Sequence, residues 1–310
     1  MTVDRVAQLV DALETTERAW EAIRGAIDLH VHVAPDVIER RIDDVDLARE
    51  FAGRGLRGFV LKSHYLPTAE RARVVEKVVP GIVAVGAITL NHAVGGLNPA
   101  AVEVSARVGA RVIWMPTVDA ANEWTGRRAS VPPAWGPVQD SLRSRAGYPP
   151  PISLLDADGR LVDAACECLE VAAAHQLVVA TGHVGRAEIF QLVARARELG
   201  VERVVITHAE FPSIDLAAEE QVELARLGAF VEHCYTTAFT GKTLWQTVFA
   251  NLRAVGPEQS LISTDLGQAA NPPVAGGLAD FAERLLTAGF DAEEVHRMAV
   301  GNPRLLIEGE

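Results

Sequence analysis

The strongest constraint on the fold of this 310-residue chain is a repeated alternation of short β-branched runs with helix-like stretches. The runs are Ile27–Val33, Arg57–Leu61, Ile82–Leu90, Ala110–Met115, Leu177–Ala180, Arg203–Thr207, Ala229–Val231 and Leu261–Ser263. Apolar strands separated by helices are typical of a parallel sheet that is covered on both faces. Eight such units over about 250 residues are the usual size of a (β/α)8 barrel. The chain therefore predicts an α/β fold, a (β/α)8 TIM barrel, as a single domain over residues 1–310. A doubly wound sheet is the alternative, but no GxGxxG follows any run.

Two segments lie outside this repeat. Apolar side chains at helical spacing over residues 4–24 predict an N-terminal helix within residues 1–25. The step from the fourth run to the fifth is longer than the others, because it contains an insertion at 119–160 with two tryptophans and several prolines. An insertion after strand four emerges where barrel active sites lie. It is either a lid, with residues near Trp124 and Trp135 closing over substrate, or a homo-oligomer contact.

Charge and composition exclude several classes of partner. The formal net charge is −12 and no run of Lys or Arg exceeds two, which argues against nucleic acid and against an anionic membrane surface. The N-terminus lacks the pattern of a signal peptide, and the longest apolar run, around Gly81–Leu90, is too short to span a bilayer. Three cysteines without a CxxC favour a reducing, cytoplasmic compartment. We therefore expect a small-molecule substrate.

The first run ends in the sequence DLHVHVAPD, which begins at Asp28. Side chains alternate along a strand, so Asp28, His30 and His32 are expected on one face. Two imidazoles about 7 Å apart on one strand face can converge on a single metal ion. Alone, the pattern is also compatible with two polar residues on a half-exposed strand.

The ends of later runs carry further metal-binding side chains. His183 follows the fifth run, His208 the sixth and Asp265 the eighth. In a barrel, these positions and His30 and His32 all point at one mouth. Neutral imidazoles and carboxylates are the ligands expected for zinc and similar divalent ions. The sequence predicts a metal centre there.

In these motifs the chain resembles the amidohydrolase superfamily. The resemblance rests on HVH, on His183, His208 and Asp265 at their strand ends, and on the ending MAVGNPRLLI. It implies that His30, His32 and Asp265 bind one metal, that His183 and His208 bind a second, and that Asp265 takes a proton from the attacking water. The cofactor would be a divalent metal, zinc above all, with one or two ions per chain; Mn and Fe are the alternatives.

One feature departs from that pattern. Binuclear members carry a carboxylated lysine after strand four, whereas here the fourth run ends without lysine and Lys62 follows the second run instead. A desolvated lysine becomes a neutral amine, which can capture carbon dioxide and bridge two metals. Lys62 could instead stay protonated and pair with Asp265 or with substrate, or it could form a Schiff base with substrate. The sequence leaves these three roles open.

Other side chains are candidates for substrate binding. His64 shares a face with Lys62, Asn91 follows the third run and Trp114 closes the fourth. On the seventh run, FVEHCY, either Glu232 or His233 faces inward. In the loop after the first run, Arg40 and Arg41 could hold an anionic group, and Arg41 is our candidate.

The leading functional hypothesis is a metal-dependent hydrolase that acts on a small-molecule C–N or C–O bond, such as a cyclic amide or lactone. The alternatives are an HxH-type phosphoesterase, a metal-dependent decarboxylase on the same scaffold and a non-catalytic metal-binding barrel. The last has no reason to retain Asp265 beside all four histidines, so their convergence separates the hypotheses.

Overall fold

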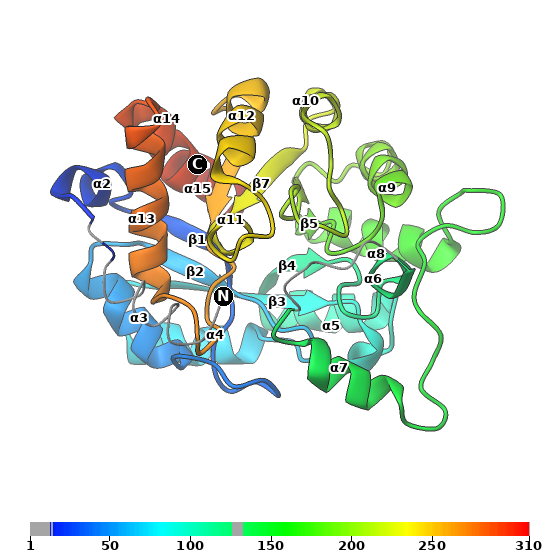
Figure 1. The fold of residues 1–310 in the computed structure, drawn as a ribbon. Helices are drawn as coiled ribbons and strands as arrows, with labels where there is room; N and C mark the ends of the chain where they lie inside the picture. Colours follow the sequence, from blue (N-terminus) through cyan, green and yellow to red (C-terminus); the bar gives the residue numbers. More distant parts are fainter. Residues whose placement is uncertain (1–12, 14, 126–132, 310) are drawn as a thin grey trace.

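The computed structural model of the chain describes residue 13 and residues 15–125 and 133–309. Eight strands pair in parallel and in chain order, and helices surround them (Figure 1). The strands are β1 (Ile27–Val31), β2 (Gly58–Leu61), β3 (Val83–Thr89), β4 (Ala110–Trp114), β5 (Val178–Ala180), β6 (Val204–Ile206), β7 (Phe230–Cys234) and β8 (Ser260–Ser263). Each of the eight predicted runs overlaps one strand, and the predicted (β/α)8 barrel is confirmed.

The barrel closes where the end of β8 meets the end of β1. The backbone N–H of Asp265 donates to the carbonyl of His30 at 2.8 Å, and the N–H of His32 donates to the carbonyl of Leu266 at 2.8 Å. These bonds continue the parallel pairing past the last residue of each strand. They place three of the predicted metal-binding residues side by side.

Helices cover the outside of the barrel (Figure 1). They are α2 (Glu17–Ala22), α3 (Asp44–Gly53), α4 (Ala69–Val78), α5 (Pro99–Val108), α6 (Ala121–Thr125), α7 (Gly136–Arg143), α8 (Asp163–Ala174), α9 (Arg186–Glu198), α10 (Ala218–Arg226), α11 (Tyr235–Phe239), α12 (Trp245–Val255), α13 (Val274–Thr287), α14 (Ala292–His296) and α15 (Asn302–Ile307), with short turns at His92–Val94 and Arg297–Gly301. Their apolar stripes face the sheet; α13, for example, buries Leu278, Phe281 and Leu285 at helical spacing. Within the described part of the chain, no helix is long and apolar enough to cross a membrane.

The barrel interior is filled by one apolar cluster with members from all eight strands. It comprises Ile27, Leu29, Val60, Val85, Ala87, Val112, Trp114, Val178, Ala180, Val205, Phe230, Leu261, Leu306 and Ile307. The last two belong to α15, whose carbonyls accept hydrogen bonds from Arg111 and Arg203 at the starts of β4 and β6. The C-terminal helix therefore closes the end of the barrel at which the strands begin, here called the lower end. The end at which the strands finish, here called the upper end, is left open for a site.

The N-terminal segment differs from its prediction. Thr16 is extended, with φ −80° and ψ 159°, and its side chain accepts from the N–H of Ala19, so it caps the start of α2. The helix therefore does not run unbroken over residues 4–24. Residues 1–12 and 14, which carry the rest of this prediction, lie outside the described residues.

The insertion at 119–160 packs over the upper end of the barrel. Its helix α7 and Trp135 lie against a small apolar cluster of Ile38, Tyr65 and Val118. Asp119 anchors it by accepting hydrogen bonds from the Gln139 side chain at 2.6 Å and from the Tyr148 hydroxyl at 2.7 Å. Residues 126–132 of the insertion lie outside the described residues.

Candidate metal centre

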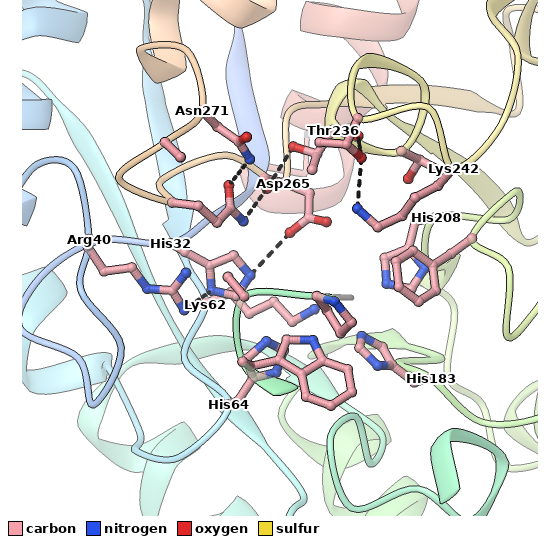
Figure 2. Close-up of a pocket in the computed structure, with 18 residues that line it drawn as sticks. His32, Arg40, Lys62, His64, His183, His208, Thr236, Lys242, Asp265 and Asn271 are labelled. Carbon is pink, nitrogen blue, oxygen red and sulfur yellow. Dashed lines mark hydrogen bonds and ion pairs between the residues drawn. The ribbon is translucent and has the colours of Figure 1, made fainter. Parts of the chain in front are cut away.

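The predicted metal-binding side chains meet at the upper end of the barrel, around a cavity of about 200 Å³ (Figure 2). His32, His183, His208, Lys62 and Asp265 line this cavity, and His30 lies directly beneath them. Each comes from the end of a different strand, except for the two histidines of β1. A pocket of this size suits a small substrate, since pockets for drug-sized ligands measure about 300–1,000 Å³.

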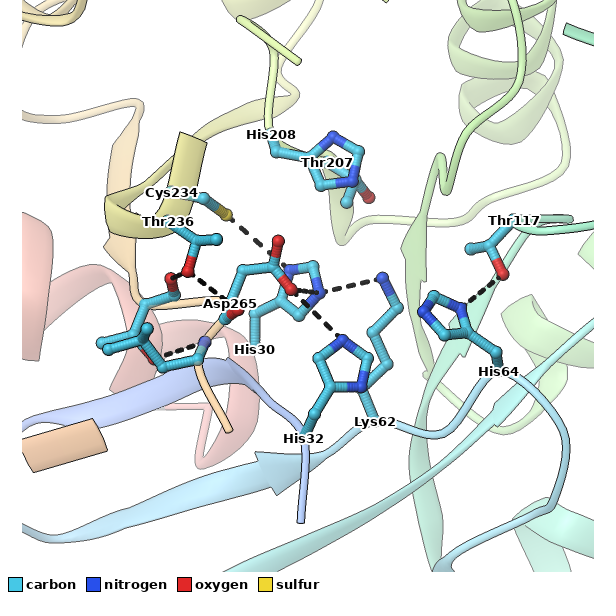
Figure 3. A network of polar contacts seen from close by, with 12 residues as sticks. His30, His32, Lys62, His64, Thr117, Thr207, His208, Cys234, Thr236 and Asp265 are labelled. Carbon is cyan, nitrogen blue, oxygen red and sulfur yellow. Dashed lines mark hydrogen bonds and ion pairs between the residues drawn. The ribbon is translucent and has the colours of Figure 1, made fainter. Parts of the chain in front are cut away.

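His30, His32 and Asp265 form the tightest group (Figure 3). Asp265 Oδ1 lies 3.2 Å from His30 Nε2 and 3.2 Å from His32 Nε2. One ligand atom from each of the three residues lies within 4.8 Å of the others, as binding to one metal requires. Burial alone raises the pKa of Asp265, but the charge and hydrogen bonds of the two histidines hold it well below its usual range. The carboxylate is therefore ionised.

Alternation puts His30 and His32 on one face of β1, and an irregularity in the strand turns that face inward although Leu29 also lies in the interior. The pairing register of β1 with β2 shifts between Asp28 and Val31. As a result Leu29 lies in the interior cluster while Val31 packs outside the sheet, although strict alternation predicted one face for both. Asp28 accepts the Thr264 hydroxyl at 2.6 Å and the Thr264 N–H at 3.1 Å, which ties the bulge to β8.

Lys62 lies against His30, with 2.9 Å between Lys62 Nζ and His30 Nε2 (Figure 3). Within the described residues, no carboxylate oxygen lies within 4.0 Å of its Nζ, so the direct ion pair with Asp265 is not formed in this structure. Burial lowers the pKa of Lys62 against the opposing pull of Asp265 and Glu232. The carboxylated bridge, the ion pair with substrate and the Schiff base stay predictions.

His183 and His208 lie side by side, with ring centroids 4.8 Å apart. His208 is also 5.8 Å from the ring of His30. Burial lowers the pKa of His183 and holds that of His208 well below its usual value, so both rings are neutral and each keeps a lone pair. The Nδ1 of His208 is buried and has no hydrogen-bond partner in the described chain. A buried polar atom without a partner suits a site that binds a ligand.

A carboxylate from the insertion supports His183. Glu123 Oε1 lies 3.1 Å from His183 Nδ1, and the hydroxyl of Ser213 donates to the same oxygen at 2.6 Å. Carboxylates placed in this way orient histidines that bind metals. Sequence reasoning missed Glu123, because only the fold brings the insertion against the end of β5.

The structure settles the register of β7. Glu232 faces inward: its Oε2 lies 3.3 Å from His30 Nδ1 and accepts the N–H of His208 at 3.1 Å. His233 faces outward, where its Nδ1 lies 2.7 Å from Glu210. Glu232 was predicted to bind substrate, but it is not among the residues that line the cavity and instead supports His30 from below.

The remaining predicted substrate residues fall into two groups. His64 lines the cavity, with its Nδ1 2.9 Å from the hydroxyl of Thr117. Asn91 does not line it; its amide donates to the carbonyl of His64 at 2.8 Å and to Thr117 at 2.7 Å, so it supports His64. Trp114 lies lower, in the interior cluster, with its ring 5.2 Å from Lys62 Nζ.

The two arginines after β1 have different surroundings. Arg40 lines the cavity, pairs with Asp36 at 2.6 Å and lies 3.3 Å from His32 Nδ1. Arg41 does not line it; its guanidinium donates to the carbonyls of Ala269 at 3.0 Å and Asn271 at 2.9 Å. Arg41 therefore supports a loop of the cavity wall, and Arg40 occupies the position that we had assigned to Arg41.

Three residues at the site have positive φ angles. His208 and Asp265 have positive φ angles of 30° and 52°, which are uncommon for residues other than glycine and gather at functional sites. Gly267 has φ +126°, and a Cβ there would lie 1.6 Å from the carbonyl oxygen of His32. Only glycine lets the segment after β8 approach β1 this closely.

The insertion contributes one of its two tryptophans to the cavity. Trp135 lines it, with its ring 6.3 Å from that of His64 and 6.2 Å from that of His183. Trp124 does not line the cavity and instead lies 4.2 Å from the guanidinium carbon of Arg143.

One protein-family model matches this chain. A family model described as a family of unknown function, DUF6282, matches residues 25–232, more than half of the chain. The chain belongs to this family. No curated protein matches this DUF6282 member by sequence.

Solved structures resemble this DUF6282 protein over nearly its whole length. An amidohydrolase from Pseudomonas aeruginosa has a TM-score of 0.60 at 15% identity, covering 95% of this chain and 99% of its own. A metallopeptidase described as dipeptidase AC has a TM-score of 0.61 at 13% identity, covering 92% and 98%. An organophosphorus hydrolase from Deinococcus radiodurans has a TM-score of 0.54 at 16% identity, covering 92% and 93%. The predicted resemblance to the amidohydrolase superfamily is confirmed in the fold.

Proposed function

We propose that this protein is a metal-dependent hydrolase that cleaves a C–N or C–O bond of a small molecule, such as a cyclic amide or lactone. One observation carries the proposal: four histidines and Asp265, from four strands, converge at one small cavity. A barrel kept only as a scaffold has no reason to hold an ionised carboxylate beside four buried histidines. Structural neighbours described as hydrolases and peptidases support the same class.

The side chains fit one or two divalent ions. His30, His32 and Asp265 would hold one, and His183 with His208 would hold a second; these nitrogen and oxygen donors suit zinc, with Mn and Fe as alternatives. The fit is supported by Glu232, which accepts at His30 Nδ1 and so puts the lone pair of the ring on Nε2, the atom that Lys62 Nζ approaches to 2.9 Å. A bound ion lowers the pKa of coordinated water toward ~7 and polarises the scissile carbonyl.

The chain itself supplies the base. Asp265 is ionised and faces the cavity, so it can accept a proton from the attacking water and later return it to the leaving group. The hydroxyl of Thr236 lies 2.8 Å from the backbone carbonyl of Thr264 and 2.9 Å from that of Asp265, so its proton, shared between the two, holds the backbone that carries this carboxylate. His64 and Trp135 form the opposite wall and position the substrate.

The test is Asp265→Asn. Asparagine coordinates weakly through its carbonyl but accepts no proton, so kcat on a panel of lactones and cyclic amides should fall by about 100- to 10,000-fold. Much of the metal should remain, as measured by metal analysis per chain. Asp280→Asn is the matched control, because Asp280 is a buried aspartate that pairs with Tyr235 and Arg284 outside the barrel. An Asp265→Asn protein that loses stability yet keeps its turnover per folded chain would refute the assignment of the base.

A further inference from the structure

One wall of the cavity is built by the segment that follows β7 (Figure 2). The backbone N–H groups of Lys242 and Thr243 both donate to the carbonyl of Thr237, at 3.0 Å and 3.2 Å. These bonds fold the segment back on itself and bring the backbone of Lys242 against that of Thr237. Both residues line the cavity, and neither was singled out as a site residue from the sequence.

Lys242 differs from the other cations of the cavity. Arg40 is paired with Asp36 at 2.6 Å, and Lys62 lies 2.9 Å from His30. The ammonium of Lys242 donates to the hydroxyl of Thr240 at 2.7 Å, but among the described residues no carboxylate lies within 4.0 Å of it. In Figure 2 its Nζ reaches into the cavity on the side of Asp265 opposite Arg40. Asp265 attracts this ammonium through space but does not pair with it, and a partly buried cation without a paired carboxylate favours an anionic ligand.

A second polar atom on the same wall is also without a partner. The hydroxyl oxygen of Thr237 is buried and makes no hydrogen bond within the described chain. Buried hydroxyls are normally hydrogen-bonded, so this one is ready to donate to a ligand in the cavity. Lys242 and Thr237 thus place two hydrogen-bond donors on one wall of the cavity.

The charge of the whole cavity supports the same conclusion. Its described lining holds three basic side chains, Arg40, Lys62 and Lys242, against one carboxylate, Asp265. The charge of Arg40 is compensated by Asp36, which lies 2.6 Å away. A divalent ion at the histidines would leave the cavity with a net positive charge, which would attract an anion.

We propose that the substrate is a small carboxylate, and that its carboxylate group binds to Lys242 Nζ and Thr237 Oγ1 while the scissile bond lies at the histidines. Two donors on one wall match the two oxygens of a carboxylate, whereas a phosphate would leave at least one further oxygen unpaired. The proposal deepens the proposed hydrolase function and rests on it for the position of the scissile bond.

The experiment measures binding and needs no turnover. Metal-loaded protein is titrated calorimetrically with N-acetylglycine, N-acetylalanine and benzoate, each beside its primary amide, and with inorganic phosphate. The variants are Lys242→Met and Thr237→Val. Lys77→Met is the matched control, since Lys77 is an exposed lysine in the last turn of α4. Metal content and melting temperature are recorded for each variant.

We expect at least one carboxylate to bind the wild-type protein more tightly than its amide and than phosphate. Loss of a hydrogen bond to a charged group weakens binding by about 10- to 150-fold, so Lys242→Met should raise Kd by about that much, and Thr237→Val by less. Lys77→Met should bind like the wild type.

Three results would overturn the carboxylate site. They are equal affinity of an acid and its amide, tighter binding of phosphate, and unchanged affinity in Lys242→Met, which is what direct binding to the metal alone would give. The failure of the hydrolase proposal looks different: carboxylates still bind through Lys242, but the wild-type protein holds no metal or hydrolyses no member of the substrate panel.

Discussion

Glu232→Gln tests whether the carboxylate beneath His30 tunes the metal centre. The glutamate lies 3.3 Å from His30 Nδ1, accepts the N–H of His208 at 3.1 Å and is buried. The Glu232 carboxylate therefore orients the ring of His30 directly and orients His208 through the backbone of that residue. Glutamine keeps the shape and one oxygen acceptor but removes the charge.

The expected loss follows from these contacts. A hydrogen bond to a charged group contributes about 1.5–3 kcal/mol, and a neutral acceptor recovers part of it. Changes of this kind beside metal ligands typically cost about 10- to 100-fold in metal affinity, which corresponds to ~1.4–2.7 kcal/mol. We expect Glu232→Gln to raise the metal Kd by that factor, as measured by competition with a chromophoric chelator.

Glu210→Gln provides the matched control. Glu210 is also buried, and its Oε1 lies 2.7 Å from His233 Nδ1 and accepts from Asn251 at 2.9 Å, but this pair lies outside the barrel. Both variants should lower the melting temperature, whereas only Glu232→Gln should weaken metal binding. Equal metal affinities in the two variants would refute the reasoning, because the effect would then be one of general stability.

Two further predictions concern the walls of the site. Gly267→Ala should lower the free energy of unfolding by about 2–5 kcal/mol in chemical denaturation, because a positive φ and a steric clash with His32 both destabilise the variant. The control is Gly81→Ala, which has φ +95° but open space and should lose only about 1–2 kcal/mol. Equal losses of stability in the two variants would contradict the close approach of Gly267 to His32. Trp135→Ala should raise KM more than it lowers kcat, because Trp135 lines the cavity, while Trp124→Ala should leave KM unchanged; steady-state kinetics of both variants decide whether the insertion forms a substrate wall.

The sequence by itself was sufficient for the barrel and for the main metal-binding candidates. Apolar runs separated by helical stretches have few folded solutions other than a covered parallel sheet. In such a sheet, the residue after each run lies at the same edge, so His183, His208 and Asp265 could be assigned to one mouth from their positions alone.

Tertiary structure decided what depends on register and on contacts between distant segments. The bulge in β1 moved Leu29 into the interior, and the register of β7 turned Glu232 inward and His233 outward. A shift of one residue reverses which face a side chain occupies, and sequence periodicity does not define that shift at a bulge or in a short strand.

The supporting residues were likewise visible only in the folded chain. Glu123 reaches His183 from the insertion, and Lys242 and Thr237 come together because a short segment folds back after β7. Loops carry no periodic pattern, and their positions follow from the packing beneath them. The position of Arg40 rather than Arg41 in the cavity wall has the same origin. Arg41 is held by the carbonyls of Ala269 and Asn271, which are far away in the sequence.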